Sequence, residues 1–270
     1  MTDRDGIEFI RRKDSQGRFY LVANQGADTI DGWVPVAAGA KTAALMDPMT
    51  GCVGKAAVRD GSNGGAAVYL QLDPGESAVV RVYPEQRLSG PAWPYLQTAG
   101  APVELEGTWH VEFIEGGPEL PGEFNTDRLA SWTEFGDDAA KRFAGTARYE
   151  LTFDAPGDEA ESRLLDLGEV CHSARVELNG RDLGTLIQPP YRVPVDDLKR
   201  SGNTLVVEVT NLSANRIRDL DVRGVDWKRF HNINFVNLDY KPFDASDWPV
   251  RDSGLLGPVT LTPAEIVQPG

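Results

Sequence analysis

Hydrophobic and polar residues alternate in short runs along most of the chain, which is the period expected of half-buried β-strands. In the first 85 residues such runs occur in IEFIRRK, GRFYLVANQ, DGWVPVAA, KTAALMDPMTG and AAVYLQLDPGESAVVRVYP. Gly, Asp, Asn or Pro separates each run from the next, and these residues favour turns. We therefore predict an all-β unit over residues 1–85.

The alternation resumes after a stretch rich in proline. Residues 84–102, PEQRLSGPAWPYLQTAGAP, contain four prolines and no long periodic run, so residues 86–102 are predicted to be a linker. Further strands are predicted in VELEGTWHVEFIEGG, GTARYELTFDAP, SRLLDLGEV, SARVELNGRDLGTL, YRVPVDDL, NTLVVEVTNL and GLLGPVTLTPAEI. Their spacing predicts an antiparallel sandwich or jelly roll over residues 103–270, with one or two helical turns within Asp127 to Phe143.

Two turns have specific sequence signals. Asp73-Pro74-Gly75 stands between two alternating apolar runs, which predicts that the strands on either side of it pair as a hairpin. Asn179-Gly180 interrupts another alternating stretch, and both residue types tolerate a positive φ, so a type I′ hairpin turn is predicted there. We expect this second turn to fix strand register and not to bind a ligand.

One long segment departs from the pattern of short connections. Residues 213–253 show no clean strand or helix period, yet they hold two of the six tryptophans and one of the three histidines. Long ordered excursions from a sandwich are usually functional, and this one is rich in the aromatic and planar polar side chains that bind sugars. The same aromatic residues could instead anchor the segment as a satellite core, and the sequence leaves both interpretations open.

The charge balance narrows the choice of partners. The 270 residues include 27 Lys and Arg against 41 Asp and Glu, which gives a net charge of −14. Nucleic acid and anionic membranes would be repelled by this excess, so we expect neither as a partner. No apolar segment resembles the core of an export signal or reaches membrane-spanning length, so neither is predicted in this chain.

Signals for catalysis or metal binding are weak. Cys52 and Cys171 lie far apart, which predicts neither a disulfide framework nor a metal–thiolate site. The histidines lack metal-ligand spacing, and neither a GxSxG nucleophile elbow nor a P-loop occurs. We expect no catalytic residue, metal ligand or cofactor, although a structural Ca²⁺ held by loop carboxylates and carbonyls would be compatible with a jelly roll.

A set of motifs in the second unit resembles a known domain. The motifs, in chain order, are FxGxAxY at Phe143 to Tyr149, DLGEV at Asp166 to Val170, VxLNG at Val176 to Gly180, PPYR at Pro189 to Arg192 and VTN at Val209 to Asn211. Together they resemble the galactose-binding-like jelly roll known as the glycoside hydrolase family 2 sugar-binding domain. The version most similar lies at the C-terminal end of bacterial enzymes like family 106 α-L-rhamnosidases, where a small β-sandwich resembling residues 1–85 precedes it.

The resemblance implies an accessory region without catalytic residues. In such enzymes the catalytic carboxylates lie in a large barrel, and this chain has no stretch of alternating strands and helices long enough to form one. The resemblance also implies a parent enzyme that works in the periplasm or outside the cell on plant or bacterial polysaccharide. A catalytic glycosidase domain would then be a partner of this chain.

We therefore predict a protein that binds an oligosaccharide or polysaccharide without cleaving it. The residues expected to contact the sugar are Trp227, His231, Tyr240, Trp248 and Arg251 in the long segment, with Arg192 and Asn211 at the sandwich edge. Arg192 could alternatively clamp a carboxylate of the long segment. Two other hypotheses stay open: a small glycoside hydrolase in which loop carboxylates and His231 transfer protons, and a docking module for a separate catalytic chain.

Overall fold

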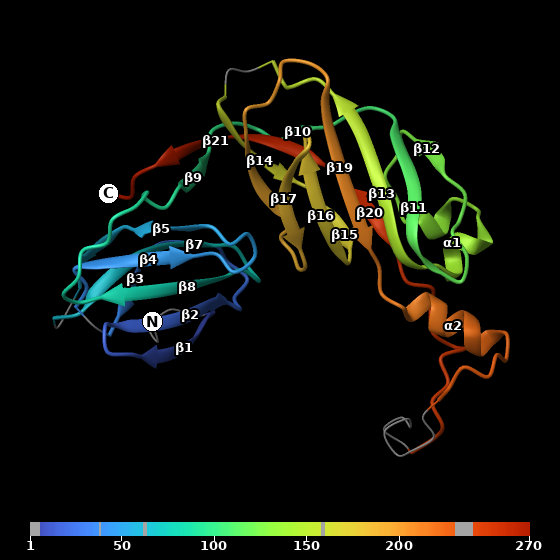
Figure 1. Cartoon of the computed structure of the whole chain (residues 1–270), viewed down its shortest axis with the longest axis horizontal. Coiled ribbons are helices and arrows are strands. Elements are labelled where there is room, and N and C mark those ends of the chain that lie inside the picture. The colour runs from blue at the N-terminus through green and yellow to red at the C-terminus, as the bar shows by residue number, and fades with distance from the viewer. Residues whose placement is uncertain (1–5, 38, 62–63, 158–159, 230–239) are drawn as a thin grey trace.

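Two β-sandwich bodies lie side by side and are joined by an extended segment (Figure 1). The computed structural model describes residues 6–37, 39–61, 64–157, 160–229 and 240–270. Strands dominate both bodies and the helices are short, so the predicted all-β, sandwich class is confirmed.

The first body packs a five-stranded antiparallel sheet against a three-stranded one. The larger sheet has the order β1 (Ile7–Lys13), β2 (Arg18–Asn24), β8 (Ser77–Tyr83), β4 (Thr42–Met46), β5 (Val53–Ala56), and the smaller has the order β3 (Ile30–Val36), β7 (Ala66–Leu72), β6 (Val58–Asp60). Alternate residues of the two sheets meet in one apolar core, in which Val22 of β2 and Val68 and Leu70 of β7 are fully buried. The period-two pattern thus gives β2, β3 and β8 one buried face each, whereas the edge strand β1 is exposed along almost its whole length.

The prediction that Asp73-Pro74-Gly75 closes a hairpin was wrong. The turn joins β7 to β8, but these strands belong to different sheets, so the chain crosses from one layer of the sandwich to the other. β8 pairs with β2 and β4, whereas β7 pairs with β3 and β6. Both strands alternate because both face the same core, and alternation alone does not distinguish hairpin partners from strands in opposite sheets.

The second body is a larger sandwich. Its six-stranded sheet has the order β12 (Phe124–Thr126), β11 (Trp109–Gly117), β13 (Ala144–Phe153), β19 (Asn203–Thr210), β16 (Ser173–Leu178), β17 (Arg181–Leu186). The facing sheet has the order β10 (Val103–Glu104), β21 (Thr260–Val267), β14 (Ser162–Asp166), β18 (Arg192–Asp196), and a short ribbon pairs β15 (Glu169–Cys171) with β20 (Gly254–Gly257). Val111 and Val207 of the first sheet share one core with Leu165 and Leu261 of the second.

Two local predictions in the second body are confirmed. Asn179 and Gly180 have φ values of 54° and 82° and join the paired strands β16 and β17, as a type I′ hairpin requires. The stretch from Asp127 to Phe143 contains the short helices η2 (Trp132–Glu134) and α1 (Asp138–Arg142). The side chain of Asp137 caps α1 by accepting a hydrogen bond from the backbone N–H of Ala139.

The segment predicted as a linker contains a strand of its own. β9 (Tyr95–Thr98) pairs with the last residues of β21, from Ala264 onward, whereas β10 and β14 pair with β21 up to Ala264. The buried hydroxyl of Tyr95 donates to the carbonyl of Tyr69 at 3.1 Å and accepts from the N–H of Ala57 at 2.9 Å, both in the first body. The segment thus contacts both bodies, and the domain boundary at residues 86–102 stays a prediction.

Candidate functional site

The long segment begins with a helix, α2 (Ala214–Val222), that the sequence analysis did not predict. Its apolar residues do not form a wide stripe, so the helical period is weak in the sequence. Charged pairs support the helix instead: Asp219 accepts from Arg223 at 2.5 Å and lies 3.7 Å from Arg216. We call residues 214–229 and 240–252 the arm, because they project from one end of the second body (Figure 1).

Helix α2 holds the returning chain of the arm in place. The guanidinium Nε of Arg218 donates to the carbonyl of Trp248 at 2.6 Å. The amide of Asn215 binds both backbone groups of Arg251, accepting from its N–H at 2.7 Å and donating to its C=O at 2.8 Å. The backbone on either side of Trp248 and Arg251 is therefore fixed by hydrogen bonds from the helix.

Asp221 is the polar centre of the arm. Its carboxylate accepts from Trp227 Nε1 at 2.7 Å, from Lys228 Nζ at 2.9 Å and from the N–H of Ala245 at 2.8 Å, and its side chain is only 5% exposed. Burial acts to raise the pKa of Asp221, but the three donors together lower it below the usual 3.8. Asp221 is thus ionised at neutral pH and binds residues that are apart in the sequence.

Aromatic rings form a row along the arm. Trp227 packs edge to face on Phe243, with ring centroids 6.1 Å apart, and Phe243 packs in the same way on Trp248 at 5.6 Å. Trp248 is 38% exposed and Tyr240 is 74% exposed. Trp227 and Phe243 therefore build a small core in the arm, whereas Trp248 and Tyr240 present aromatic surface to solvent.

Four of the seven predicted site residues lie on the arm: Trp227, Tyr240, Trp248 and Arg251. His231 lies outside the described residues. Asn211 is buried at the base of the arm, where its Oδ1 accepts from the N–H of Gly145 and its Nδ2 donates to the carbonyl of Phe143 and to Ser253 Oγ. Both N–H groups of this amide are thus engaged inside the protein.

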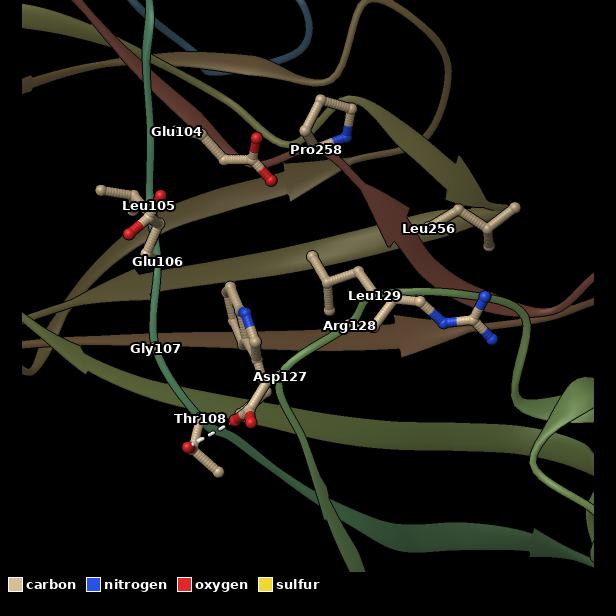
Figure 2. A pocket seen from close by; sticks show the side chains of 11 residues that line it. Glu104, Leu105, Glu106, Gly107, Thr108, Asp127, Arg128, Leu129, Leu256 and Pro258 are labelled. Carbon is tan, nitrogen blue, oxygen red and sulfur yellow. Dashed lines mark hydrogen bonds between the residues drawn. The ribbon is translucent and has the colours of Figure 1, made fainter.

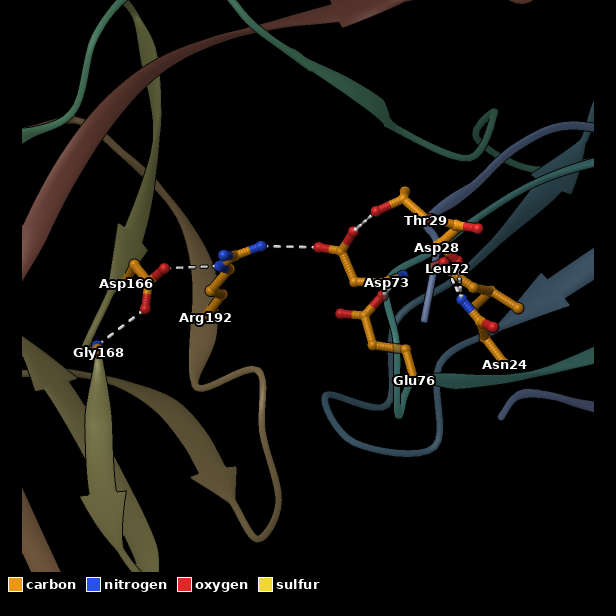
Figure 3. Close-up of polar contacts among 9 residues, drawn as sticks. All are labelled: Asn24, Asp28, Thr29, Leu72, Asp73, Glu76, Asp166, Gly168 and Arg192. Atoms are coloured by element: carbon orange, nitrogen blue, oxygen red, sulfur yellow. Dashed lines mark hydrogen bonds and ion pairs between the residues drawn. The ribbon is translucent and has the colours of Figure 1, made fainter. Parts of the chain in front are cut away.

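Arg192 bridges the two bodies. Its Nε donates to Asp166 at 2.6 Å and its Nη1 to Asp73 at 2.7 Å, across the junction shown in Figure 3. Asp73 also accepts from Thr29 Oγ1 at 2.6 Å. The sequence-based alternative, that Arg192 clamps a carboxylate of the long segment, was wrong about the partner, because both carboxylates come from elsewhere.

Two hollows lie at the edge of the second body. The larger, of about 720 Å³, lies where β10, the segment Asp127–Leu129 and the turn between β20 and β21 meet (Figure 2). Glu104, Glu106 and Asp127 contribute carboxylates, and Asp127 accepts from Thr108 Oγ1 at 2.6 Å. No local sequence pattern predicts this hollow, because its lining residues come from three separate segments.

The smaller hollow has a volume of about 390 Å³ and an aromatic lining. It lies beside β12 and the helices η2 and α1, and its walls include Phe113, Phe124, Trp132 and Phe135, with Glu123 and Asn125 among its polar residues. None of these residues was a sequence-based candidate. The only signal was an unusual density of aromatic residues in a turn-rich stretch.

The described residues were compared with the requirements of metal sites and membrane spans. No group of three or more His, Cys, Asp or Glu side chains within it is arranged to hold a metal ion. No helix in the described ranges combines the length and apolar character needed to cross a membrane.

Neither Cys52 nor Cys171 forms a disulfide. Burial raises the pKa of Cys171 to about 11, so its thiol is protonated at neutral pH.

Comparison with known proteins links both bodies to one class of enzyme. No family model matches the chain. A protein of Formosa agariphila named "Putative beta-glucuronidase" is 32% identical over 217 residues, which are 71% of this chain and 19% of that protein. The structure of a rhamnosidase from Novosphingobium sp. PP1Y matches with a TM-score of 0.71 and 31% identity, over 96% of this chain and 24% of the rhamnosidase chain.

The chain is related to glycoside hydrolases. The match to the rhamnosidase covers almost the whole chain and therefore includes both bodies. The chain spans about a fifth of the curated relative and about a quarter of the rhamnosidase.

Proposed function

We propose that this chain is a non-catalytic, carbohydrate-binding accessory region of a larger glycoside hydrolase. The observation that carries the proposal is the match of 96% of the chain to 24% of a rhamnosidase, because it places a similar pair of bodies within a much longer glycosidase. The motifs around Phe143, Asp166 and Val176 support a galactose-binding-like jelly roll for the second body, preceded by a separate small sandwich domain.

The arm is the proposed sugar-binding surface. Trp248 exposes part of its ring while Phe243 packs against it and Arg218 holds its backbone. A partly exposed aromatic ring that is held in place can pack against the apolar C–H face of a sugar ring. Arg251 is exposed, and its guanidinium can donate hydrogen bonds to sugar hydroxyls. Single-site affinity should be micromolar or weaker, because sugar hydroxyls exchange water for protein partners with little net gain.

The hydrogen bonds of Asp221 bear on the hydrolase alternative. The buried carboxylate of Asp221 accepts hydrogen bonds from three donors. These donors lower its pKa, so the carboxylate is ionised at neutral pH. A general acid must instead keep its proton near neutral pH. The arrangement around Asp221 therefore supports a structural role for this carboxylate and excludes it as the general acid of the hydrolase alternative.

Docking on a catalytic domain is a second candidate function. Val222, Val225 and Val250 of the arm are 54%, 40% and 43% exposed. Residues 213–253 contain seven Lys or Arg and seven Asp or Glu, so this segment is neutral and the remainder of the chain has the whole net charge of −14. An exposed apolar and neutral segment on an acidic protein is compatible with a protein contact.

A retention assay separates these functions. The purified chain is mixed with insoluble plant and bacterial polysaccharides, and both the bound protein and the released reducing ends are measured. Retention without release supports the proposed function, release overturns its non-catalytic part, and the absence of both favours docking.

Replacing the exposed tryptophan tests the arm itself. Trp248→Ala is expected to weaken retention about tenfold or more, since tenfold corresponds to about 1.4 kcal/mol and aromatic anchors contribute on this scale. Phe9→Ala is the matched control, because Phe9 is a similarly exposed aromatic residue (36%) on β1 of the first body. Equal retention of the two variants would remove Trp248 from the binding site.

A further inference from the structure

The smaller hollow of the second body has the aromatic walls of a sugar site. Phe124 of β12 and Phe135, which follows η2, are half-buried, and their ring centroids are 4.9 Å apart with the planes inclined at 40°. Phe113 of β11 lies behind them, 6.4 Å from Phe124. The rings offer inclined apolar faces next to a space of about 390 Å³, within the range of about 300–1,000 Å³ common for small-molecule sites.

One residue of the same wall carries a buried polar group without a partner. Trp132 lines the hollow and is fully buried, and its indole Nε1 has no hydrogen-bond partner among the described residues. Its plane is fixed by edge-to-face contacts with Phe113 at 5.3 Å and Phe143 at 5.8 Å. Buried donors are normally paired, and a hydroxyl oxygen of a ligand would supply the acceptor that the protein does not.

The polar residues of the hollow favour a neutral ligand over an acidic one. Glu123 and Asp137 contribute carboxylates, and Asn125 contributes an amide whose Oδ1 lies 3.1 Å from His110 Nδ1. Carboxylates accept hydrogen bonds from hydroxyl groups but repel another carboxylate, and the chain as a whole is acidic.

We propose that this hollow binds one neutral pyranose unit, with the rings of Phe124 and Phe135 against its C–H groups and the N–H of Trp132 donating to one of its oxygens. The proposal rests on the carbohydrate-related function proposed above and adds a second site to it. The hollow shares no residue with the arm.

The test is a titration of the ¹⁵N-labelled full chain followed by NMR. Methyl α-L-rhamnopyranoside is the neutral probe and methyl β-D-glucuronide is the acidic one, each in the millimolar range. The indole N–H signal of Trp132 is identified by its loss in Trp132→Phe. It should shift saturably with the rhamnoside, and the glucuronide should bind at least about tenfold more weakly.

Variants connect the signal to the hollow. Asn125→Ala, at an exposed rim position, should raise the Kd for the rhamnoside about tenfold or more. Glu265→Gln, an exposed position on β21, should leave it unchanged and controls for the removal of a surface polar group. Trp248→Ala should also leave the Trp132 shift intact, because the hollow does not include the arm.

The outcomes distinguish this inference from the proposed function. If the arm amides shift and Trp132 does not, the hollow is not a sugar site and the proposed function stands. If Trp132 shifts and the arm does not, the hollow is the site and the arm assignment fails. Equal binding of both glycosides, or loss of the Trp132 shift in Trp248→Ala, would overturn the inference.

Discussion

Asn211 joins segments of the second body that are distant in the sequence. Its amide binds Gly145, Phe143 and Ser253, so it connects β13 to the end of β19 and to the chain leaving the arm. Asn211→Ala leaves buried donors and acceptors without partners, and a loss of about 2–3 kcal/mol in the free energy of unfolding is expected. Urea denaturation measures this loss.

The control for this change is Asn125→Ala, which removes the same side chain from an exposed position. It should change the free energy of unfolding by less than about 0.5 kcal/mol. Similar values for the two variants would show that Asn211 does not connect these segments as described.

At the residue level the sequence indicated which side chains can bind a sugar. It did not indicate which of them are exposed in the folded protein. Trp248 and Tyr240 are exposed, whereas Asn211 and Arg192 are engaged with partners 66 and 119 residues away. No local pattern contains those partners. The same limit applies to Trp132 and Phe135, whose hollow exists only after β11, β12 and the short helices have packed.

At the level of elements, Asp221 determines whether the arm keeps its structure. Asp221→Asn removes the charge that pairs with Lys228 and weakens the hydrogen bonds from Trp227 and Ala245. Hydrogen exchange at the indole of Trp227 and the amide of Ala245 should become at least several-fold faster, with little change in global unfolding. Asp226→Asn, an exposed position on the arm, should leave exchange unchanged.

The same carboxylate gives the arm a pH dependence of known sign. The pKa of Asp221 is lower in the folded protein than its usual 3.8, so its stabilising contribution is present above that value and is lost as the pH falls through the folded pKa. Protection of the arm should therefore decrease below about pH 4, once exchange rates are corrected for intrinsic pH effects. A flat profile in the wild type would contradict this role.

The predictions for elements succeeded where a local pattern determined the outcome. Asn179-Gly180 formed its hairpin because the positive φ values needed are a property of those two residues. The Asp73-Pro74-Gly75 turn instead joined two layers, since partner choice depends on the whole sandwich. Helix α2 was missed because ion pairs and contacts with the returning chain stabilise it, and neither gives a hydrophobic period.

At the scale of the whole molecule, Arg192 couples the two bodies. Arg192→Ala leaves Asp73 and Asp166 facing each other across the junction without the cation between them. We expect a loss of about 1 kcal/mol in stability, because the arginine is partly exposed, and a larger radius of gyration in small-angle X-ray scattering. Arg175→Ala, which breaks ion pairs with Asp182 and Glu208 on the six-stranded sheet, should leave the radius unchanged.

The ionised side chain of Glu76, beside this junction, should lower the free energy of unfolding at neutral pH. Burial raises the pKa of Glu76 above 4.5 despite a hydrogen bond from the N–H of Asp73. The folded state therefore holds this proton more tightly than the unfolded state, and stability falls as the pH rises from the unfolded to the folded pKa. Glu76→Gln keeps an acceptor for Asp73 and should raise Tm by roughly a few degrees at pH 7, but not at pH 4.

Strand β21 joins the second body to the connecting segment, since its first residues complete a sheet of the second sandwich and its last residues pair with β9. Cutting the chain near residue 102 would place β9 in one fragment and β21 in the other. Each strand would then expose unpaired backbone N–H and C=O groups along one edge. The two fragments, produced separately and mixed, should therefore recombine into a native-like complex. Such recombination would show that the two parts assemble without a covalent link near residue 102.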